Sequence, residues 1–187
     1  MDIITHKKCG SLRLIIGPMF SGKSTELIKR AGRLKSIGKK ILTVVHQIDD
    51  RYGKGMISTH NGNHWFENVT ISDKLSEIDV REYDVVIVEE LQFFEDAFSN
   101  IVSWVDEIGI DVICAGLDGD FKRSAFGDVL KLIPYADEIL RLSALCKLCG
   151  DGTEAHFSKR IIKSDDKVVV GGASSYEAVC RKHYLID

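Results

Sequence analysis

The clearest chemical signature in the sequence is the run Gly17-Pro18-Met19-Phe20-Ser21-Gly22-Lys23-Ser24. It follows an apolar segment, residues 12–16, and leads directly into residues with helical spacing. A glycine turn between a strand and a helix directs backbone N–H groups and the positive end of the helix toward an anion. In this Walker A pattern the lysine reaches the β- and γ-phosphates and the serine hydroxyl binds Mg²⁺. The sequence therefore predicts a nucleotide-binding P-loop; the alternative is a glycine-rich turn without a ligand.

Two adjacent acids, Glu89 and Glu90, follow a second apolar run at residues 85–88. A buried strand that ends in an acid is typical of a Walker B strand, whose carboxylate holds Mg²⁺ beside the P-loop. Neighbouring carboxylates in different environments acquire different pKa values, so one can serve the metal while the other accepts a proton from an attacking hydroxyl. The alternative is a strand that enters a loop with two exposed glutamates.

Two pairs of metal-ligand residues share the same internal spacing: Cys146 with Cys149, and Cys180 with His183. Three thiolates and one imidazole can close a tetrahedral, structural Zn²⁺ site, which leaves no position for a catalytic water. The chain has 5 cysteines, and an odd number in a reducing compartment favours metal binding or burial over disulfides. Cys114 lies in an apolar run and is expected to be a packing residue. The alternative for the two pairs is a set of reduced thiols.

Two polar loops follow predicted strands. Residues 46–63 carry Asp49, Asp50 and Arg51, and this arginine either contacts a nucleotide phosphate or forms salt bridges within a surface loop. The loop after residue 116 carries Phe121 and Phe126, with two basic residues between them. Aromatic rings suit stacking on a planar base, and basic groups suit phosphate. Two core phenylalanines are the alternative.

The elements that position these residues alternate between strand and helix. Strands are expected at 12–16, 41–45, 83–88, 112–116 and 138–142, and helices at 24–37, 96–108 and, more weakly, 73–80. Residues 157–162 and 167–170 are expected to form a hairpin around 164–166. Short buried strands joined by helices predict an α/β fold, with a parallel sheet flanked by helices.

The whole-chain properties fit one main domain with a small appendage, because the chain has 187 residues. We place the nucleotide-binding domain at residues 1–143 and the metal-binding domain at 144–187. The net charge of -3 gives no electrostatic footprint for nucleic acid. Residues 1–10 lack the apolar core of a signal peptide, and no run approaches a membrane span of about 20 apolar residues. We therefore expect a cytoplasmic protein without a membrane or nucleic-acid partner.

Together, these pieces resemble the cytosolic, type II thymidine kinase family over nearly the whole chain. The motifs that occur in the family's order are Gly17-Pro18-Met19-Phe20-Ser21-Gly22-Lys23-Ser24-Thr25-Glu26-Leu27, Glu90-Leu91-Gln92-Phe93-Phe94, Gly116-Leu117-Asp118-Gly119-Asp120-Phe121, Phe126-Gly127, the two ligand pairs, and Gly171-Gly172 with Tyr176. The most specific of them is the P-loop filled by Pro-Met-Phe-Ser. Three positions depart from the family's usual residues: Glu89 stands in place of aspartate, His183 in place of cysteine, and Ala125 in place of proline.

The resemblance implies a P-loop NTPase-like fold and transfer of the γ-phosphoryl group of ATP to the 5′-hydroxyl of thymidine, for salvage of pyrimidine deoxynucleosides in DNA synthesis. It also implies that deoxyuridine is a possible substrate and that Glu90 is the general base. ATP and Mg²⁺ would be bound by Gly17, Pro18, Met19, Phe20, Ser21, Gly22, Lys23, Ser24, Asp49, Asp50, Arg51, Glu89 and Gln92. The nucleoside would be bound by Met19, Phe93, Leu117, Phe121, Phe126, Lys167, Val168, Val169, Val170, Gly171 and Tyr176.

The resemblance further implies a structural Zn²⁺ at Cys146, Cys149, Cys180 and His183 that holds a lid over the nucleoside, called the lasso. It suggests a homotetramer and feedback inhibition by thymidine triphosphate. Two other classes of protein stay open. A P-loop ATPase would hydrolyse ATP without a nucleoside, and a zinc ribbon would bind oligonucleotides in a salt-dependent way. The absence of a strong basic stripe and the second acid at the strand end disfavour both.

Overall fold

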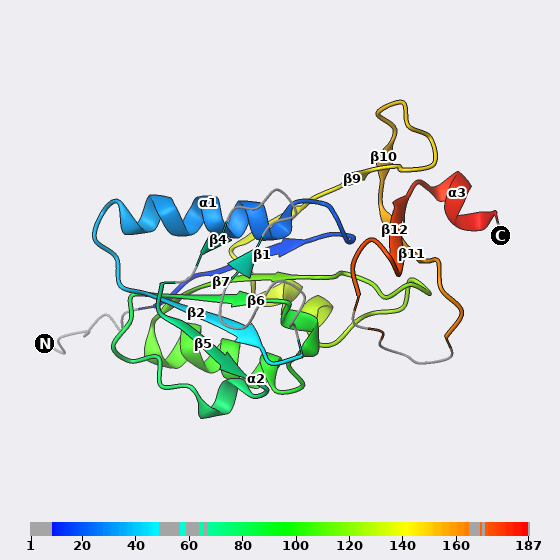
Figure 1. Cartoon of the computed structure of the whole chain (residues 1–187). Helices are drawn as coiled ribbons and strands as arrows, with labels where there is room; N and C mark the ends of the chain where they lie inside the picture. Colours follow the sequence, from blue (N-terminus) through cyan, green and yellow to red (C-terminus); the bar gives the residue numbers. More distant parts are fainter. Residues whose placement is uncertain are drawn as a thin grey trace, which may run out of the picture.

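A parallel sheet of six strands forms the centre of the fold (Figure 1). The computed structural model describes residues 9–48, 57–58, 64–65, 67–164, 169 and 171–186. The sheet consists of β1 (Leu12–Ile16), β2 (Ile41–His46), β5 (Val69–Ser72), β6 (Val85–Glu89), β7 (Asp111–Gly116) and β8 (Glu138–Arg141). Their order is β5-β2-β6-β7-β1-β8, and every neighbouring pair is parallel. The predicted α/β class and five predicted strands are therefore confirmed, and β5 is an additional strand.

The strand register brings the chemically interesting residues to one edge of the sheet. Val45 of β2 pairs with Glu89 of β6, and Ile16 of β1 pairs with Gly116 of β7. The P-loop and the loop after β7 follow these paired ends, and the acidic pair begins at the last residue of β6. Parallel strands that run in register deliver the residues after them to the same edge, which is where ligands bind in open α/β sheets.

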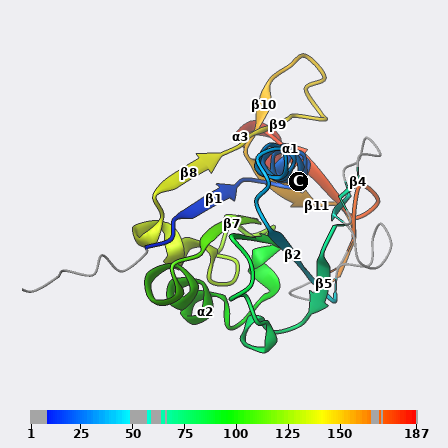
Figure 2. The ribbon, with the colours of Figure 1, turned by 90° about the vertical axis from the view of Figure 1, so that its left-hand side faces the viewer.

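Helices cover both faces of the sheet, as Figure 2 shows. On one face lies α1 (Lys23–Lys35), whose Leu27 and Ala31 are fully buried against the strands. On the other face lie α2 (Ala97–Ser103), a π-helical turn at Trp104–Ile108 and a 3₁₀ segment at Val129–Tyr135. The predicted helix at 96–108 is therefore present, and its last residues form the wider turn of a π-helix. The apolar side chains on each face of the sheet pack against the helices that cover that face, so a hydrophobic core lies on each side of the sheet.

The weak helix predicted at 73–80 is wrong. The structure has only a short 3₁₀ turn there, Leu75–Glu77. The carboxylate of Asp96 accepts hydrogen bonds from the backbone N–H groups of Leu75 (3.0 Å) and Ser76 (2.9 Å), and the Leu75 side chain is buried in the core. A contact from a distant segment therefore fixes this turn, and local helical spacing does not decide its conformation.

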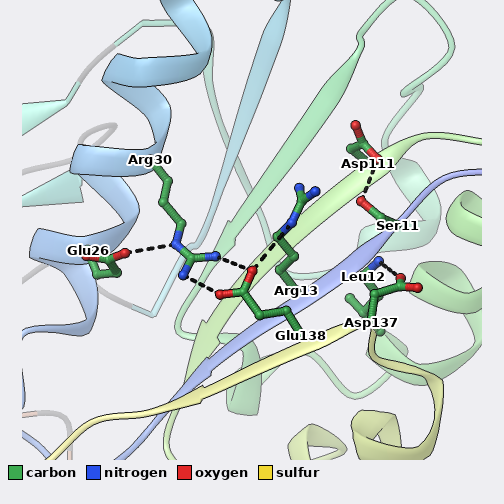
Figure 3. Close-up of polar contacts among 8 residues, drawn as sticks. All are labelled: Ser11, Leu12, Arg13, Glu26, Arg30, Asp111, Asp137 and Glu138. Carbon is green, nitrogen blue, oxygen red and sulfur yellow. Dashed lines mark hydrogen bonds and ion pairs between the residues drawn. The ribbon is translucent and has the colours of Figure 1, made fainter.

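An ion-pair cluster ties α1 to the edge strand β8 (Figure 3). The Arg30 guanidinium donates to Glu26 at 2.9 Å within α1 and to both carboxylate oxygens of Glu138 on β8, at 2.6 and 3.1 Å. Arg13 of β1 lies 3.6 Å from the same Glu138 carboxylate. A forked guanidinium fixes both distance and orientation, so this cluster holds the helix that follows the P-loop against the sheet.

The C-terminal unit lies beyond the carboxyl edge of the sheet (Figure 1). It contains two antiparallel strand pairs, β9 (Ala144–Leu145) with β10 (Glu154–Ala155) and β11 (Phe157–Arg160) with β12 (Tyr176–Val179), followed by α3 (Arg181–Leu185). The unit has its own small core, against which Phe20 of the P-loop packs. A further short pair, β3 (Ile57–Ser58) with β4 (His64–Trp65), precedes β5.

Only the first half of the predicted hairpin at 157–170 can be compared with the structure. Its first half corresponds to β11, but the described residues pair this strand with β12, whose cross-strand partners for residues 157–160 are residues 179–176. Most of the second half, including Lys167, Val168 and Val170, lies outside the described residues. The sequence thus located β11 correctly and did not predict its pairing with β12.

Candidate active site

The P-loop backbone has the shape that its glycines predict. Gly17 and Gly22 have φ values of 148° and 84°, and a Cβ atom at Gly17 would lie 2.4 Å from the carbonyl oxygen of Leu142. Only glycine fits there without displacing the chain. The Lys23 ammonium folds back and donates to the carbonyl oxygen of Pro18 at 2.8 Å. The turn and the first residues of α1 therefore form a backbone-lined cradle that suits an anion.

The structure brings the P-loop helix and the acidic pair together. The Ser24 hydroxyl donates to an oxygen of Glu89 at 2.5 Å, and the Glu89 side chain is almost fully buried. Hydroxyl and carboxylate oxygens are hard ligands of the kind that Mg²⁺ prefers. The two residues could therefore supply oxygen ligands to a magnesium ion next to the P-loop.

Glu90 lies directly after β6 in an unusual backbone conformation, with φ 52°. The amide nitrogen of the buried Gln92 side chain donates to the Glu90 carboxylate, and its amide oxygen accepts from the backbone N–H of Leu117 at 3.0 Å. Gly127 lies so close that an added Cβ would be 2.4 Å from the Gln92 carbonyl oxygen. Gln92 therefore connects the acid to the loop after β7 instead of facing solvent.

Aromatic side chains line the same edge. The rings of Phe93 and Phe126 meet edge to face, with centroids 5.7 Å apart. The centroid of the His46 ring also lies 5.7 Å from that of Phe93. The Arg160 guanidinium carbon lies 3.7 Å from the centroid of the Phe121 ring. Phe121 and Phe126 are both only partly buried, and neither belongs to the buried core. Their placement favours a ligand-facing loop over two core phenylalanines.

The C-terminal unit contacts this edge through β11 and β12. The backbone N–H of Met19 in the P-loop donates to the Ser158 hydroxyl at 2.9 Å. The buried Tyr176 hydroxyl donates to the carbonyl oxygen of Val169 at 2.9 Å and accepts from Arg160 at 3.0 Å. A Cβ at Gly171 would lie 2.5 Å from the Ser175 hydroxyl oxygen. The unit is therefore bound directly to the phosphate cradle.

A small cavity of about 170 Å³ lies between the P-loop, the loop after β7 and β11. Its lining includes Pro18, Arg123, His156 and an ion pair between Arg141 and Asp118 at 2.8 Å. Several residues of this region did not stand out in the sequence. Ser158 and Arg160 belong to no motif that the sequence pattern singles out, and His46 lies at a strand end without any motif.

Not all of the predicted site residues can be placed. Asp49, Asp50, Arg51, Lys167, Val168 and Val170 lie outside the described residues. The other predicted residues lie at or after the ends of β1, β6 and β7 or belong to the C-terminal unit. Among the helices that the structure describes, none is long and apolar enough to cross a membrane.

The metal-ligand pairs converge as their spacing predicts. The Nδ1 atom of His183 lies 3.4 Å from the sulfurs of Cys146 and Cys149 and 3.5 Å from that of Cys180, and the Cys149 and Cys180 sulfurs are 3.8 Å apart. Zn–S and Zn–N bonds of about 2.3 and 2.0 Å give tetrahedron edges of about 3.5–3.8 Å. The four donors therefore fit a structural zinc ion.

The thiols of this cluster differ in their ease of ionisation. Burial raises the pKa of Cys146, but hydrogen bonds from the Cys180 backbone and from His183 outweigh that effect and lower its pKa to about 6. Burial and the neighbouring Cys146 raise the pKa of Cys149 to about 11. Cys146 therefore ionises more easily than Cys149, and metal binding must displace the proton of Cys149. Cys114 is buried in β7, as expected for a packing residue.

Comparison with known proteins agrees with this geometry. The family model described as thymidine kinase matches residues 10–184. A rice thymidine kinase is 38% identical over 182 residues, covering 94% of this chain and 66% of its own length. A vaccinia virus (strain Western Reserve) thymidine kinase is 40% identical over 178 residues, covering 94% of this chain and 97% of its own. Thymidine kinase a of Arabidopsis thaliana is 38% identical over 189 residues, covering 98% of this chain and 79% of its own. The chain belongs to the thymidine kinase family.

Proposed function

We propose that this protein is an ATP-dependent thymidine kinase that transfers the γ-phosphoryl group of ATP to the 5′-hydroxyl of thymidine, yielding thymidine monophosphate and ADP. The observation that carries the proposal is the 2.5 Å contact between Ser24 and Glu89, which joins the P-loop helix to the end of β6, directly before Glu90. Deoxyuridine is the expected second substrate. The activity would serve salvage of pyrimidine deoxynucleosides for DNA synthesis.

The P-loop would bind ATP through Gly17, Pro18, Met19, Phe20, Ser21, Gly22, Lys23 and Ser24. Backbone N–H groups would hold the β-phosphate, and Lys23 would exchange its contact with the Pro18 carbonyl for phosphate oxygens. Ser24 and Glu89 would hold Mg²⁺, which supplies charge compensation for the transferring phosphoryl group. Asp49 to Arg51 are proposed as further parts of the nucleotide site.

Glu90 would accept the proton from the 5′-hydroxyl of the nucleoside. The proposal is supported by its place next to Glu89 and by the hydrogen bond from Gln92, which holds the carboxylate while the same amide anchors the loop after β7. Because phosphoryl transfer involves little covalent chemistry on the protein, alignment of the hydroxyl with the γ-phosphate supplies much of the rate.

The nucleoside would lie under the C-terminal lid, between the loop after β7 and β12. The proposed contacts are Met19, Phe93, Leu117, Phe121, Phe126, Lys167, Val168, Val169, Val170, Gly171 and Tyr176. The edge-to-face pair of Phe93 and Phe126 and the position of Tyr176 on the lid support an aromatic-lined pocket. A structural zinc at Cys146, Cys149, Cys180 and His183 would hold the lid, and the residues from 144 onward would act as a separate lasso domain.

We further propose a cytoplasmic homotetramer that thymidine triphosphate inhibits by occupying the active site. Support for assembly comes from β8, which ends the strand order of the sheet, and from apolar side chains exposed on and before it. These side chains are Leu130, Ile133, Tyr135 and Ile139. The mass of the protein in solution would test the assembly directly.

The experiment that tests the function is an ADP-release assay with ATP, Mg²⁺ and a panel of nucleosides. The proposal expects release that depends on thymidine, with deoxyuridine accepted and purine nucleosides rejected. Release at the same rate without any nucleoside would instead identify an ATPase. Salt-dependent binding of an oligonucleotide without thymidine-dependent release would favour a zinc-ribbon function.

A further inference from the structure

The tip of the loop after β7 depends on the C-terminal unit for its position. One end of the loop is fixed by the Leu117 backbone bond to Gln92 and by the ion pair of Asp118 with Arg141 of β8. The other end is fixed by the contact of the Phe126 ring with Phe93. Between them, the Asp120 carboxylate accepts from two backbone N–H groups of its own turn, at 2.8 and 2.9 Å. These internal bonds shape the turn but do not attach it to the sheet, so the position of its tip is set by other contacts.

Tyr184 supplies one of these contacts. Its hydroxyl donates to the carbonyl oxygen of Phe121 at 2.8 Å, from a position 63 residues away in the sequence. Its ring packs against Phe157, with centroids 5.3 Å apart, and the Arg123 guanidinium lies 4.5 Å from the ring centroid. The tyrosine therefore contacts the tip of the loop both through its hydroxyl and through its ring.

The same tyrosine is coupled to the Cys/His cluster. Tyr184 directly follows His183 in α3, and its backbone N–H donates to the carbonyl oxygen of Cys180 at 2.9 Å. The Lys159 ammonium of β11 donates to the carbonyl oxygen of His183 at 3.1 Å. When His183 and Cys180 are held by a common ion, the turn that carries Tyr184 is held with them.

From this chain of contacts we infer that Tyr184 is a positioning residue, through which the closed metal cluster orders the loop that carries Phe121. The inference deepens the proposed function, because Phe121 is one of the proposed nucleoside contacts. Arg160 covers the ring of Phe121 independently, so loss of the Tyr184 hydroxyl would loosen the loop backbone without removing all support from its aromatic ring.

The test compares the zinc-loaded full-length protein with Tyr184→Phe, which keeps the ring and removes only the hydroxyl. Tyr83→Phe is the matched control, because Tyr83 precedes β6 at the opposite edge of the sheet. The first readout is amide hydrogen exchange of residues 117–127, and the second is the metal content. We expect unchanged zinc content and faster exchange of this loop in Tyr184→Phe alone. We also expect KM for thymidine to rise by about 2- to 10-fold, the worth of one hydrogen bond, with KM for ATP unchanged.

Chelation of the metal tests whether the metal cluster acts on the loop through Tyr184, or whether Tyr184 acts on the loop without it. In the wild-type protein, chelation should speed exchange of residues 117–127, and in Tyr184→Phe it should add little to a loop that is already loosened. Wild-type exchange of this loop in Tyr184→Phe would overturn the inference. Failure of the wild-type protein to phosphorylate thymidine would overturn the proposed function instead, while the exchange data would still decide the role of Tyr184.

Discussion

Glu90 has a left-handed backbone directly after β6, next to the residue that contacts Ser24. A residue other than glycine in this region costs of order 1–3 kcal/mol, and the surrounding contacts must hold it there. The hydrogen bond from the Gln92 amide and the close packing of Gly127 on the Gln92 backbone supply such contacts. The chain therefore accepts a strained backbone at the proposed base, which is consistent with a need to hold the Glu90 carboxylate in one position even at a cost in stability.

Replacement of this acid tests its role. Glu90→Gln keeps a side chain of similar size, so ATP binding should stay close to that of the wild type. The turnover number should fall by about 10²–10⁴-fold, the usual contribution of general base catalysis. Steady-state kinetics with thymidine measures both quantities. Glu95→Gln, a change at an exposed acid in the same stretch, is the control. Wild-type turnover in Glu90→Gln would remove Glu90 from the mechanism.

Among the elements, β11 has a contact that sequence spacing could not indicate. Met19 and Ser158 are 139 residues apart, yet the Ser158 hydroxyl accepts the backbone N–H of Met19. This bond uses a P-loop donor to attach the lid strand to the phosphate cradle. The lid and the cradle therefore share one hydrogen bond near the point where both substrates are proposed to meet.

Ser158→Ala should weaken this attachment and leave the Met19 N–H without its partner. Because an unsatisfied buried donor costs about 1–3 kcal/mol, we expect kcat/KM for thymidine to fall by about 5- to 100-fold. Ser158→Thr keeps the hydroxyl and should restore most of the activity. Kinetics of the two variants side by side provides the measurement. If the alanine and threonine variants behave alike, the hydroxyl does not position the lid.

The contact between α1 and β8 predicts a pH-dependent contribution to stability. Hydrogen bonding to Arg30 lowers the pKa of Glu138, and the pKa of Glu26 is also lowered, although burial opposes that change. A lowered pKa in the folded state means that this stability is present above the ordinary value of 4.5 and is lost as pH falls through the folded-state pKa values. The cluster in Figure 3 should therefore stabilise the protein near neutral pH and not in strong acid.

Arg30→Gln should lower the free energy of unfolding by about 1 kcal/mol at pH 7, and the difference from the wild type should shrink as the pH falls below 4.5. Urea unfolding at a series of pH values measures this difference. Arg81→Gln is the control, since Arg81 and its partner Asp79 are largely exposed and their ion pair should contribute little. An equal loss of stability in Arg30→Gln at every pH would show that Arg30 does not stabilise the protein through its ion pairs.

At the scale of the whole molecule, the Cys/His cluster should hold the C-terminal unit in place. Chelation at pH 7 should speed amide exchange in residues 144–164 and 171–186 and weaken thymidine binding more than ATP binding. Calorimetric titration of each ligand measures the two affinities. Re-addition of Zn²⁺ should restore both the exchange rates and the thymidine affinity. Unchanged thymidine affinity in fully metal-free protein would contradict a zinc-held lid.

How much could be predicted depended on how local the determining contacts are. The P-loop, the strands of the sheet and the Cys/His cluster follow from neighbouring residues and short spacings, and the structure agrees with each of them. The conformation of residues 73–80 could not be predicted in this way, because Asp96, in another segment, fixes the turn at Leu75. The pairing of β11 with β12 and the contact of Tyr184 with Phe121 join distant parts of the chain, and one sequence carries no signal for such partners.

The central claim is that the P-loop, the acidic pair and the lid form one site for phosphoryl transfer from ATP to a nucleoside. The most direct test follows the label from ATP that is radioactive in its γ-phosphate, in a single turnover with thymidine and Mg²⁺. The account predicts that the label appears on the 5′-oxygen of thymidine and that this product forms about 10²–10⁴-fold more slowly in Glu90→Gln. Label found only in inorganic phosphate, at a rate that thymidine does not change, would contradict it.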